Sequence, residues 1–256
     1  MLAAERRDLL LDRLRRDGKL VAKDLAAELG LSEDSVRRDL RELAAAGLCQ
    51  RVYGGALPVS PALADYATRT GVEPASKRRV AARAARLVLP GSTVLVDGGT
   101  TALAVIGALS RDLACTVITH SPTIAAALLD HPSIDVFLLG GRLFKHSAVT
   151  CGAVAVSAAN TISADVFLLG VTGVHPTEGL TTGDAEEAAM KRALAGRAAD
   201  TYVLASAEKI GAASRYTVLA LADVAGIVTD APETDPNLAD LRRQGVPIVA
   251  AHRAAH

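Results

Sequence analysis

Hydrophobic residues near the start of the chain recur at the spacing of amphipathic helices. Over residues 5–47, leucines and valines stand three or four positions apart, and Gly18, Gly30 and Gly47 interrupt the pattern. An apolar stripe at this spacing predicts a helix, and glycine is frequent just past a helix end. Ser32 is well suited to cap the helix that follows it. The pattern therefore predicts three short helices before Gly47.

A different pattern begins at residue 75. Short apolar runs of strand length alternate with alanine-rich helical stretches: TVLVD occupies 93–97, and DVFLLG occurs at 135–140 and again at 165–170. Strands that alternate with helices are typical of an α/β domain in which helices cover both faces of a parallel sheet. Residues 75–256 are therefore expected to form a larger α/β domain with a mainly parallel sheet.

Residues 58–74 separate the two patterns. The stretch contains three prolines and shows little periodicity. Proline lacks a backbone N–H and interrupts regular structure. We therefore expect residues 1–57 to form a small, mostly α-helical domain and residues 58–74 to form a linker to the α/β domain at 75–256.

Composition narrows the class of protein. Half of the 256 residues are hydrophobic, which is enough for a buried core, and no apolar run reaches the roughly 20 residues of a membrane span. The N-terminal segment lacks a signal-peptide pattern, so a cytoplasmic protein without membrane contact is the simplest expectation. The three cysteines stand far apart and outside any Cys/His cluster, so no metal, disulfide or cofactor is expected.

Arginine is concentrated in one predicted helix, although the formal net charge of the chain is zero. Arg37, Arg38 and Arg41 fall within residues 32–48. At about 100° per residue, their side chains point away from the apolar stripe that includes Val36. A neutral chain can bind nucleic acid only through a local basic patch such as this one.

Two interpretations of the charged face are open for the helix alone. The arginines can pair with Asp34, Asp39 and Glu42 on a solvated surface, or they can bind DNA. The surroundings favour DNA, because a glycine turn precedes the helix and a Gly54-Gly55 hairpin follows it. This order is that of a winged helix-turn-helix, whose second helix enters the major groove. A helix-turn-helix that binds protein is a third interpretation, which salt-dependent binding to duplex DNA would reject.

The candidate DNA-binding residues lie in this helix and on the hairpin. Serine hydroxyls at the helix start can bond phosphate oxygens, and arginine can donate two hydrogen bonds to guanine. The predicted set is Ser32, Ser35, Arg37, Arg38, Arg41, Arg51 and Tyr53.

A glycine-rich turn follows the first predicted strand of the α/β domain. It reads Asp97-Gly98-Gly99-Thr100-Thr101 and leads into an alanine-rich helix. Glycines let backbone N–H groups approach a ligand, and a helix N-terminus favours an anion. The turn matches neither a dinucleotide fingerprint nor a Walker A loop, so a small phosphorylated metabolite is the better prediction.

Polar groups follow other predicted strands as well. His120 and Ser121 end one run, Gly140 and Gly141 end the next, and Lys209 follows a later one. Ligands of open parallel sheets lie beyond the carboxyl ends of the strands, so these groups can converge on one crevice. Each of them taken singly is equally consistent with ordinary loop chemistry.

Two long stretches resemble a known family. LAAELGLSEDSVRRDLRELAAAGLCQRVYGGAL at 25–57 is similar to the helix-turn-helix of the DeoR family of bacterial transcription regulators. Its hallmark is a serine-started recognition helix with Arg-Arg-Asp-Leu and a Gly-Gly-Ala wing, where Tyr53 replaces the usual histidine. Residues 75 to about 230 resemble the family's sensor domain, which shares the fold of ribose-5-phosphate isomerase; the matching stretches include LLGGRL, DVFLLGVTGV, EGLTTGDAEEAAMKRAL and SAEKIG.

The resemblance also implies residue roles in the sensor domain. It implies that Gly99, Thr100 and Thr101 hold a sugar phosphate together with Lys77 and Lys209. His120 stands where the family has asparagine, and Ser206 where it has aspartate, so the identity of the sugar is open.

The competing interpretation is a sugar-phosphate isomerase that carries a DNA-binding arm. Isomerisation through an enediol needs a base, and Glu186 or Glu187 is a candidate. The acidic stretch of the isomerase corresponds, however, to residues 171–174, which read Val-Thr-Gly-Val and carry no carboxylate. We therefore expect a binding domain, not an enzyme, in which Glu186 and Glu187 contact ligand hydroxyls or charge a helix N-terminus.

The sequence thus predicts a sequence-specific DNA-binding regulator, expected to be a repressor of carbohydrate-metabolism genes. The expected partners are operator DNA and a phosphorylated sugar effector, with assembly as a homodimer or homotetramer. The predicted effector-binding residues are Lys77, Asp97, Gly98, Gly99, Thr100, Thr101, His120, Ser121, Gly140, Gly141, Glu186 and Lys209.

Overall fold

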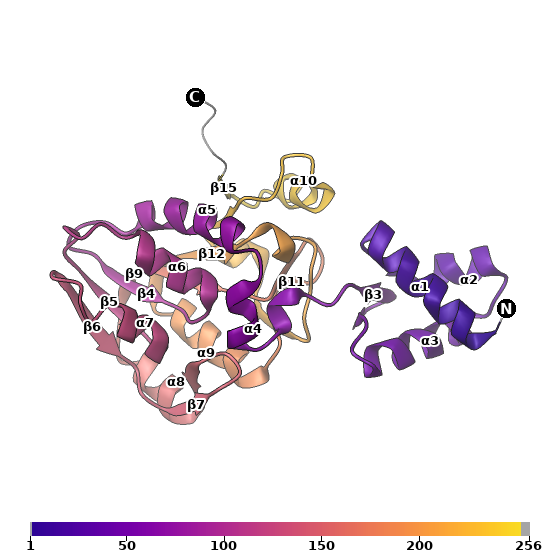
Figure 1. Ribbon diagram of the computed structural model, residues 1–256, viewed down its shortest axis with the longest axis horizontal. Coiled ribbons are helices and arrows are strands. Elements are labelled where there is room, and N and C mark those ends of the chain that lie inside the picture. The colour runs from indigo at the N-terminus through magenta and orange to yellow at the C-terminus, as the bar shows by residue number, and fades with distance from the viewer. Residues whose placement is uncertain (1, 252–256) are drawn as a thin grey trace.

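The N-terminal domain consists of three helices and a small sheet (Figure 1). The computed structural model describes residues 2–251. The helices of this domain are α1 (Ala3–Asp17), α2 (Ala22–Leu29) and α3 (Glu33–Ala45), and its strands are β1 (Leu20–Val21), β2 (Gln50–Val52) and β3 (Gly55–Leu57). The three predicted helices and the hairpin are confirmed. Leucines at the predicted spacing, such as Leu10, Leu14 and Leu40, pack into one buried cluster.

Strand β1 is an addition that the hydrophobic pattern did not predict. Leu20 pairs with Ala56 and Val21 with Gly55, so β3 lies between β1 and β2. A Cβ atom at Gly55 would lie 1.8 Å from the backbone oxygen of Leu20. Only glycine allows this approach, and the hairpin is thereby joined directly to the segment between α1 and α2.

The segment expected to be a linker is folded against the α/β domain. It contains a short 3-10 helix, η1 (Pro61–Leu63), and the helix α4 (Tyr66–Gly71). The buried Ser60 Oγ donates a hydrogen bond of 2.5 Å to the Thr172 carbonyl, and the Tyr66 amide donates one of 2.8 Å to the His146 carbonyl. The domain limits at 57 and 75 stay a prediction, but the stretch between them is not an unstructured linker.

The α/β domain is built on a seven-stranded sheet in which every neighbouring pair is parallel, as predicted. In spatial order the strands are β15 (Ile248–Ala250), β14 (Gly226–Thr229), β12 (Ala198–Ala205), β9 (Ala164–Gly170), β4 (Thr93–Val96), β5 (Cys115–Thr119) and β6 (Ile134–Leu138). Their side chains alternate between two buried clusters: Leu95 packs into one, and Val94 and Val96 into the other.

Helices cover both faces of this sheet (Figure 1). One face is covered by α5 (Pro74–Ala84), α6 (Thr100–Ala108) and α7 (Pro122–Ala127), and the other by α8 (Ala153–Ala159), α9 (Ala185–Ala195) and α10 (Pro236–Arg243). Two small antiparallel sheets complete the domain: β10 (Gly173–His175), β11 (Gly179–Thr182) and β13 (Tyr216–Leu219) form one, and β7 (Arg142–Phe144) and β8 (Val149–Cys151) the other. Within residues 2–251, no helix is both long and apolar enough to span a bilayer.

The order of the strands reverses between β4 and β9. From β4 the chain proceeds to β5 and β6 on one side, and it then returns to β9 and continues outward through β12, β14 and β15 on the other. A crevice forms at such a switch point, beyond the carboxyl ends of the two central strands. The turn at 97–101 and the residues at 170–172 therefore meet there.

Candidate functional site

The outer face of α3 carries three exposed arginines. Val36 and Leu40 are buried against the rest of the N-terminal domain, whereas Arg37, Arg38 and Arg41 are exposed. The helix begins at Ser32, whose Oγ accepts a hydrogen bond of 3.2 Å from the Ser35 amide. The face thus projects guanidinium groups beside a helix N-terminus.

The acidic residues of α3 mostly face away from these arginines. Asp39 is paired with Arg6 of α1, and Glu42 lies 2.5 Å from Nη1 of Arg7, also of α1. Only Arg37 has a partner on its own helix, Glu33, at 2.6 Å.

Within the described residues, Arg38 and Arg41 have no acidic partner. A solvated face of mutually paired charges therefore accounts for Arg37 but not for Arg38 or Arg41.

The hairpin adds to this face. Arg51 is exposed on β2, and Tyr53 at the turn is fully exposed. Arg37, Arg51 and Tyr53 line one surface hollow, and Arg41, Arg51 and Tyr53 line a second. Arg37 and Arg41 of the helix thus lie next to Arg51 and Tyr53 of the hairpin.

The second candidate site is a cavity at the switch point of the large sheet. Six predicted effector-binding residues line it: Lys77, Gly98, Gly99, Thr100, Thr101 and Lys209. Lys77 comes from α5, the threonines from the first turn of α6, and Lys209 from a 3-10 helix, η3 (Ala207–Lys209), after β12. Because the first amides of a helix lack acceptors within the helix, the start of α6 presents free N–H groups here.

Both predicted lysines are buried. Nζ of Lys209 donates to the Leu204 carbonyl at 3.3 Å and lies 3.5 Å from Oγ1 of Thr101. Burial away from water lowers the pKa of Lys209 to about 8, against the opposing effect of Glu208. Nζ of Lys77 donates to the Arg69 carbonyl at 2.5 Å, and burial lowers its pKa as well. An ammonium group that is short of counter-charge is stabilised by an anionic ligand.

Two charged residues of the cavity wall were not predicted: Arg69 and Lys191. Arg69 comes from α4, inside the stretch expected to be a linker. Glu187 and Lys191 stand four residues apart on α9 and share its buried face with Met190 and Leu194. The four-residue spacing from Glu187 was visible in the sequence and is the signal that could have identified Lys191.

Glu186 does not line the cavity, so it does not make the ligand contact expected of it; its place in the first turn of α9 fits the other role expected for it. Asp184 caps α9 by accepting hydrogen bonds from the amides of residues 186 and 187. The helix then turns Glu186 outward, where it is exposed and paired with Arg142. Its neighbour Glu187 is buried in the wall, with Oε2 at 3.5 Å from Oγ1 of Thr182.

Asp97 and His120 lie beneath the glycine turn instead of lining the cavity. Asp97 is fully buried and accepts hydrogen bonds from Nε2 of His120 at 2.7 Å, Nζ of Lys191 at 2.5 Å and the amides of Gly98 and Gly170 at 2.8 Å each. Burial favours the neutral acid, but Lys191 and His120 outweigh it and hold the pKa of Asp97 below its usual range. Asp97, held by His120, therefore fixes the position of the glycine turn.

Three further predicted residues also lie outside the cavity wall. Ser121 is buried, with Oγ donating to the Ala148 carbonyl at 3.1 Å. Gly140 and Gly141 are exposed in the turn between β6 and β7. No group of three or more histidine, cysteine or acidic residues in the described part of the chain is arranged to hold a metal.

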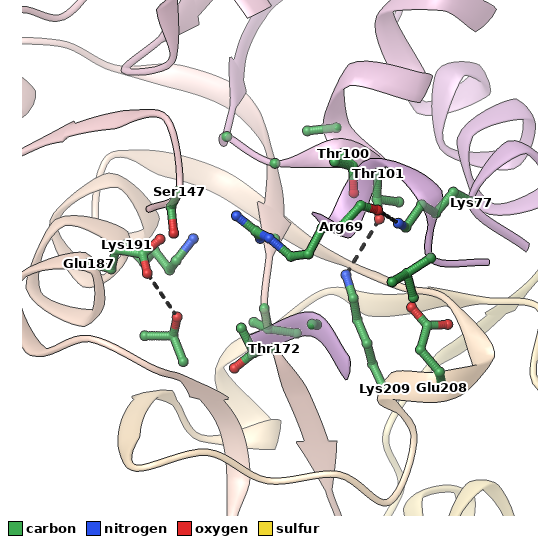
Figure 2. A pocket seen from close by; sticks show the side chains of 18 residues that line it. Arg69, Lys77, Thr100, Thr101, Ser147, Thr172, Glu187, Lys191, Glu208 and Lys209 are labelled. Carbon is green, nitrogen blue, oxygen red and sulfur yellow. Dashed lines mark hydrogen bonds between the residues drawn. The ribbon is translucent and has the colours of Figure 1, made fainter. Parts of the chain in front are cut away.

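The close view shows how the side chains of the cavity are distributed (Figure 2). Thr100, Thr101, Lys77 and Lys209 gather on one side, and Glu187, Lys191 and Ser147 on the other. The guanidinium group of Arg69 lies between the two groups. The cavity therefore has a cationic end at the start of α6 and a mixed polar end at α9.

Both domains match models of known families. Residues 6–62 match the DeoR-like helix-turn-helix domain, and residues 72–231 match the DeoR C terminal sensor domain. These two ranges contain nearly all of the residues discussed above.

Whole-chain relatives are transcription regulators. The chain is 31% identical to the HTH-type transcriptional regulator GlpR of Haloferax volcanii, over 97% of this chain and 98% of the relative. It is 26% identical to the glycerol-3-phosphate regulon repressor of Escherichia coli, over 91% of this chain and 92% of the relative. Among solved structures, the sorbitol operon regulator SorC of Klebsiella pneumoniae aligns over 93% of this chain and 97% of its own, at 12% identity and a TM-score of 0.43.

The domain matches and the relatives agree with the arrangement of the two sites. An arginine-bearing recognition helix with its wing precedes a separate polar cavity in an α/β domain. The chain belongs to the DeoR family of DNA-binding transcriptional regulators, and it is a regulator and not an isomerase.

Proposed function

We propose that a phosphorylated sugar bound in the cavity controls the affinity of this regulator for its operator. The observation that carries the proposal is the set of four cations in the cavity wall, Arg69, Lys77, Lys191 and Lys209, against only two acids in that wall, Glu187 and Glu208. Lys191 is paired with Asp97 beneath the turn, so the other three cations exceed the two wall acids by one positive charge. That excess of positive charge selects an anion.

On the DNA side, α3 enters the major groove with its arginine face toward the bases. Arg38 and Arg41, free of acidic partners in the described chain, are the residues for guanine or phosphate contacts. Arg37 and the hydroxyls of Ser32 and Ser35 contact the flanking phosphates, and Arg51 with Tyr53 extends the contact along the wing.

On the ligand side, the phosphate group lies at the cationic end of the cavity. Amides of the first turn of α6, the hydroxyls of Thr100 and Thr101, and the ammonium groups of Lys77 and Lys209 bind its oxygens. The sugar hydroxyls then reach Glu187 and Thr182 at the other end, where a carboxylate can accept their hydrogen bonds.

The name of one relative supports a role for this chain as a repressor of carbohydrate-metabolism genes. One relative represses a glycerol-3-phosphate regulon, which links this family to a small phosphorylated polyol. We propose that this chain represses carbohydrate-metabolism genes in the cytoplasm, as a homodimer or homotetramer. An even number of copies places two recognition helices on two half-sites of an operator.

The ligand half is tested with a thermal-shift panel. Ribose 5-phosphate, glucose 6-phosphate, fructose 1-phosphate and glycerol 3-phosphate are compared with their unphosphorylated parents. A specific ligand at about a hundred times its Kd stabilises the folded state by about 2.7 kcal/mol. At least one phosphorylated compound is expected to raise the melting temperature while its parent does not. Equal shifts with a parent sugar would contradict the proposal.

The DNA half is tested by selection of duplexes from a random-sequence pool. The full-length protein is expected to enrich a palindromic sequence and to bind it less tightly as the salt concentration rises. Failure to enrich any sequence would contradict DNA reading by α3, whatever the outcome of the ligand panel.

A further inference from the structure

Arg69 differs from the other cations of the cavity in where it comes from. Lys77, Lys191 and Lys209 belong to the α/β domain, but Arg69 is carried by α4, in the segment that joins this domain to the N-terminal domain. Its guanidinium group reaches the middle of the cavity (Figure 2). A residue of the connecting segment therefore forms part of the ligand site.

The guanidinium group of Arg69 has two neighbouring hydrogen-bond donors that lack acceptors among the described residues. Nε and Nη2 of Arg69 are both buried and have no hydrogen-bond partner among the described residues. These two nitrogens form the edge that binds two oxygens at once, as Arg6 does with Asp39. Buried donors without acceptors are destabilising, so the edge is suited to a ligand that supplies two oxygens.

The surroundings hold this edge in place. The ring of Tyr66 lies under the guanidinium carbon, 5.9 Å from its centroid. On the other side the group approaches the glycine turn, because a Cβ at Gly99 would lie 3.8 Å from Nη1. Within residues 2–251 no carboxylate forms an ion pair with Arg69. Burial lowers its pKa, against the opposing effect of Glu187, which again indicates a cation short of counter-charge.

The segment that carries Arg69 leads directly to the wing. Strand β3 ends at Leu57, and Ser60, three residues later, is anchored on the Thr172 carbonyl in the cavity wall. At the other end, Lys77 holds the Arg69 carbonyl. Eight residues (58–65) connect β3 to α4, and one of them, Ser60, is anchored to the cavity wall, so the wing, this anchor and α4 lie on one continuous segment.

We propose that the Nε–Nη2 edge of Arg69 clamps the phosphate of the effector, and that this contact couples effector binding to DNA binding by fixing the position of α4. The inference rests on the proposed function and adds the coupling residue to it. A phosphate offers the two oxygens that the edge requires, whereas an uncharged sugar does not.

The binding step is tested with Arg69→Lys, which keeps the charge and removes the double donor. The sugar phosphates of the thermal-shift panel and inorganic phosphate serve as probes, and affinity is measured by calorimetry. Arg69→Lys is expected to weaken binding by roughly tenfold to a hundredfold. The matched control is Arg78→Lys, at an exposed position of α5 outside the cavity, which is expected to bind as wild type does. Unchanged affinity in Arg69→Lys would overturn the clamp.

The coupling step is tested at saturating ligand on a duplex selected by the wild-type protein. The ratio of operator affinities with and without ligand is measured for wild type, Arg69→Lys and Lys209→Ala. Lys209→Ala is expected to need more ligand but to reach the wild-type ratio, since it leaves α4 in contact with the phosphate. Arg69→Lys is expected to keep a ratio near one even when saturated. A wild-type ratio in saturated Arg69→Lys would overturn the coupling role.

Different results would refute the sugar phosphate proposal and the Arg69 clamp. If no panel compound stabilises wild type, the sugar phosphate proposal fails. Inorganic phosphate binding that depends on Arg69 would then still support the clamp. If a panel compound binds wild type and Arg69→Lys equally, the sugar phosphate proposal stands and the clamp fails.

Discussion

Asp39 of α3 forms a two-point ion pair with Arg6 of α1, and Asp39 is buried while Arg38, which precedes it, is exposed. Nε and Nη2 of Arg6 both donate to the carboxylate, and Asp39 is 3% exposed. The adjacent residue, Arg38, points to solvent without a partner in the described chain. The acid of the Arg-Arg-Asp-Leu sequence therefore fixes the rotation of α3 and with it the direction of the arginine face.

Removal of this carboxylate is expected to destabilise the N-terminal domain. Asp39→Asn leaves Arg6 without its charged acceptor, and such a loss costs about 1 to 3 kcal/mol. Glu42→Gln is the matched control, because it breaks the exposed pair with Arg7 and such pairs contribute about 0 to 1 kcal/mol. Differential scanning calorimetry of the full chain measures both. Equal effects would show that Asp39 is not a buried anchor.

Arg38→Ala is expected to weaken operator binding by about 1 to 3 kcal/mol and leave ligand affinity unchanged. The physical reason is the loss of a guanidinium group that is free to meet a base or a phosphate. Arg15→Ala, at an exposed position of α1 paired with Asp12, serves as the control of equal charge change. Fluorescence anisotropy at several salt concentrations distinguishes a contact of Arg38 with a base from a contact with a phosphate. A base contact is lost mainly on the selected sequence, whereas a phosphate contact is lost on every duplex and lowers the salt slope by about one.

Ligand affinity is expected to fall as the pH rises past 8. Burial lowers the pKa of Lys209 to about 8, so its ammonium group is lost above that value, and each further pH unit reduces affinity by up to about tenfold. The phosphate itself is already a dianion there, because its second pKa is about 6. Calorimetric titration between pH 6.5 and 9.5 measures this, and the profile of Lys209→Ala should be flatter. An equally steep fall in that variant would assign the titration to another group.

The lowered pKa of Lys209 makes the stability of the ligand-free protein depend on pH in the opposite direction from ligand affinity. Unfolded Lys209 keeps its proton up to its ordinary pKa of 10.5, whereas the folded protein releases it near pH 8. Because the unfolded state holds more protons between these values, the contribution of this residue to the free energy of unfolding rises with pH in that window. Denaturant titrations of wild type and Lys209→Met at pH 7.5 and 9.5 should show a smaller rise in the variant.

Two neighbouring glutamates are expected to behave differently. Glu187→Gln is expected to weaken binding of a sugar phosphate by about tenfold, because a buried acceptor for hydroxyls is lost, but not to weaken binding of inorganic phosphate. Glu186→Gln, on the exposed face of α9, is expected to change neither. The reverse pattern, with Glu186 affecting the sugar, would refute the placement of the hydroxyl end.

Most of the fold followed from periodicity along the chain. The helices α1 to α3 and the seven parallel strands coincide with the apolar stripes and runs. Strand β1 is only two residues long, too short for any pattern, and it exists because of its pairing with β3. Helix α4 follows a proline and has no buried stripe of its own, so its stability comes from contacts with the α/β domain that no local pattern reveals.

The candidate cavity was predicted where its residues stand together in the sequence or where the family resemblance supplied them. The turn from Gly98 to Thr101 is local, and the resemblance supplied Lys77 and Lys209. Arg69 was missed because a lone arginine in an aperiodic stretch carries no signal. Glu186 and Glu187 were not distinguished from each other, because the face of α9 depends on where Asp184 caps it. His120 was expected to touch a ligand, but the return of β8 beside its strand places it under the turn, with Nδ1 2.8 Å from the Thr150 carbonyl.

The pairing of β1 with the wing strand has a consequence for how such a regulator is switched. Because Leu20 and Val21 hold Gly55 and Ala56, the wing and the three helices are fastened into a single unit. An allosteric signal that enters at Leu57 would reorient this unit as a whole instead of melting the recognition helix. Amide exchange in α3 should therefore be equally slow in the states that do and do not bind DNA, and in the proposed homodimer the spacing between the two α3 helices is what would change.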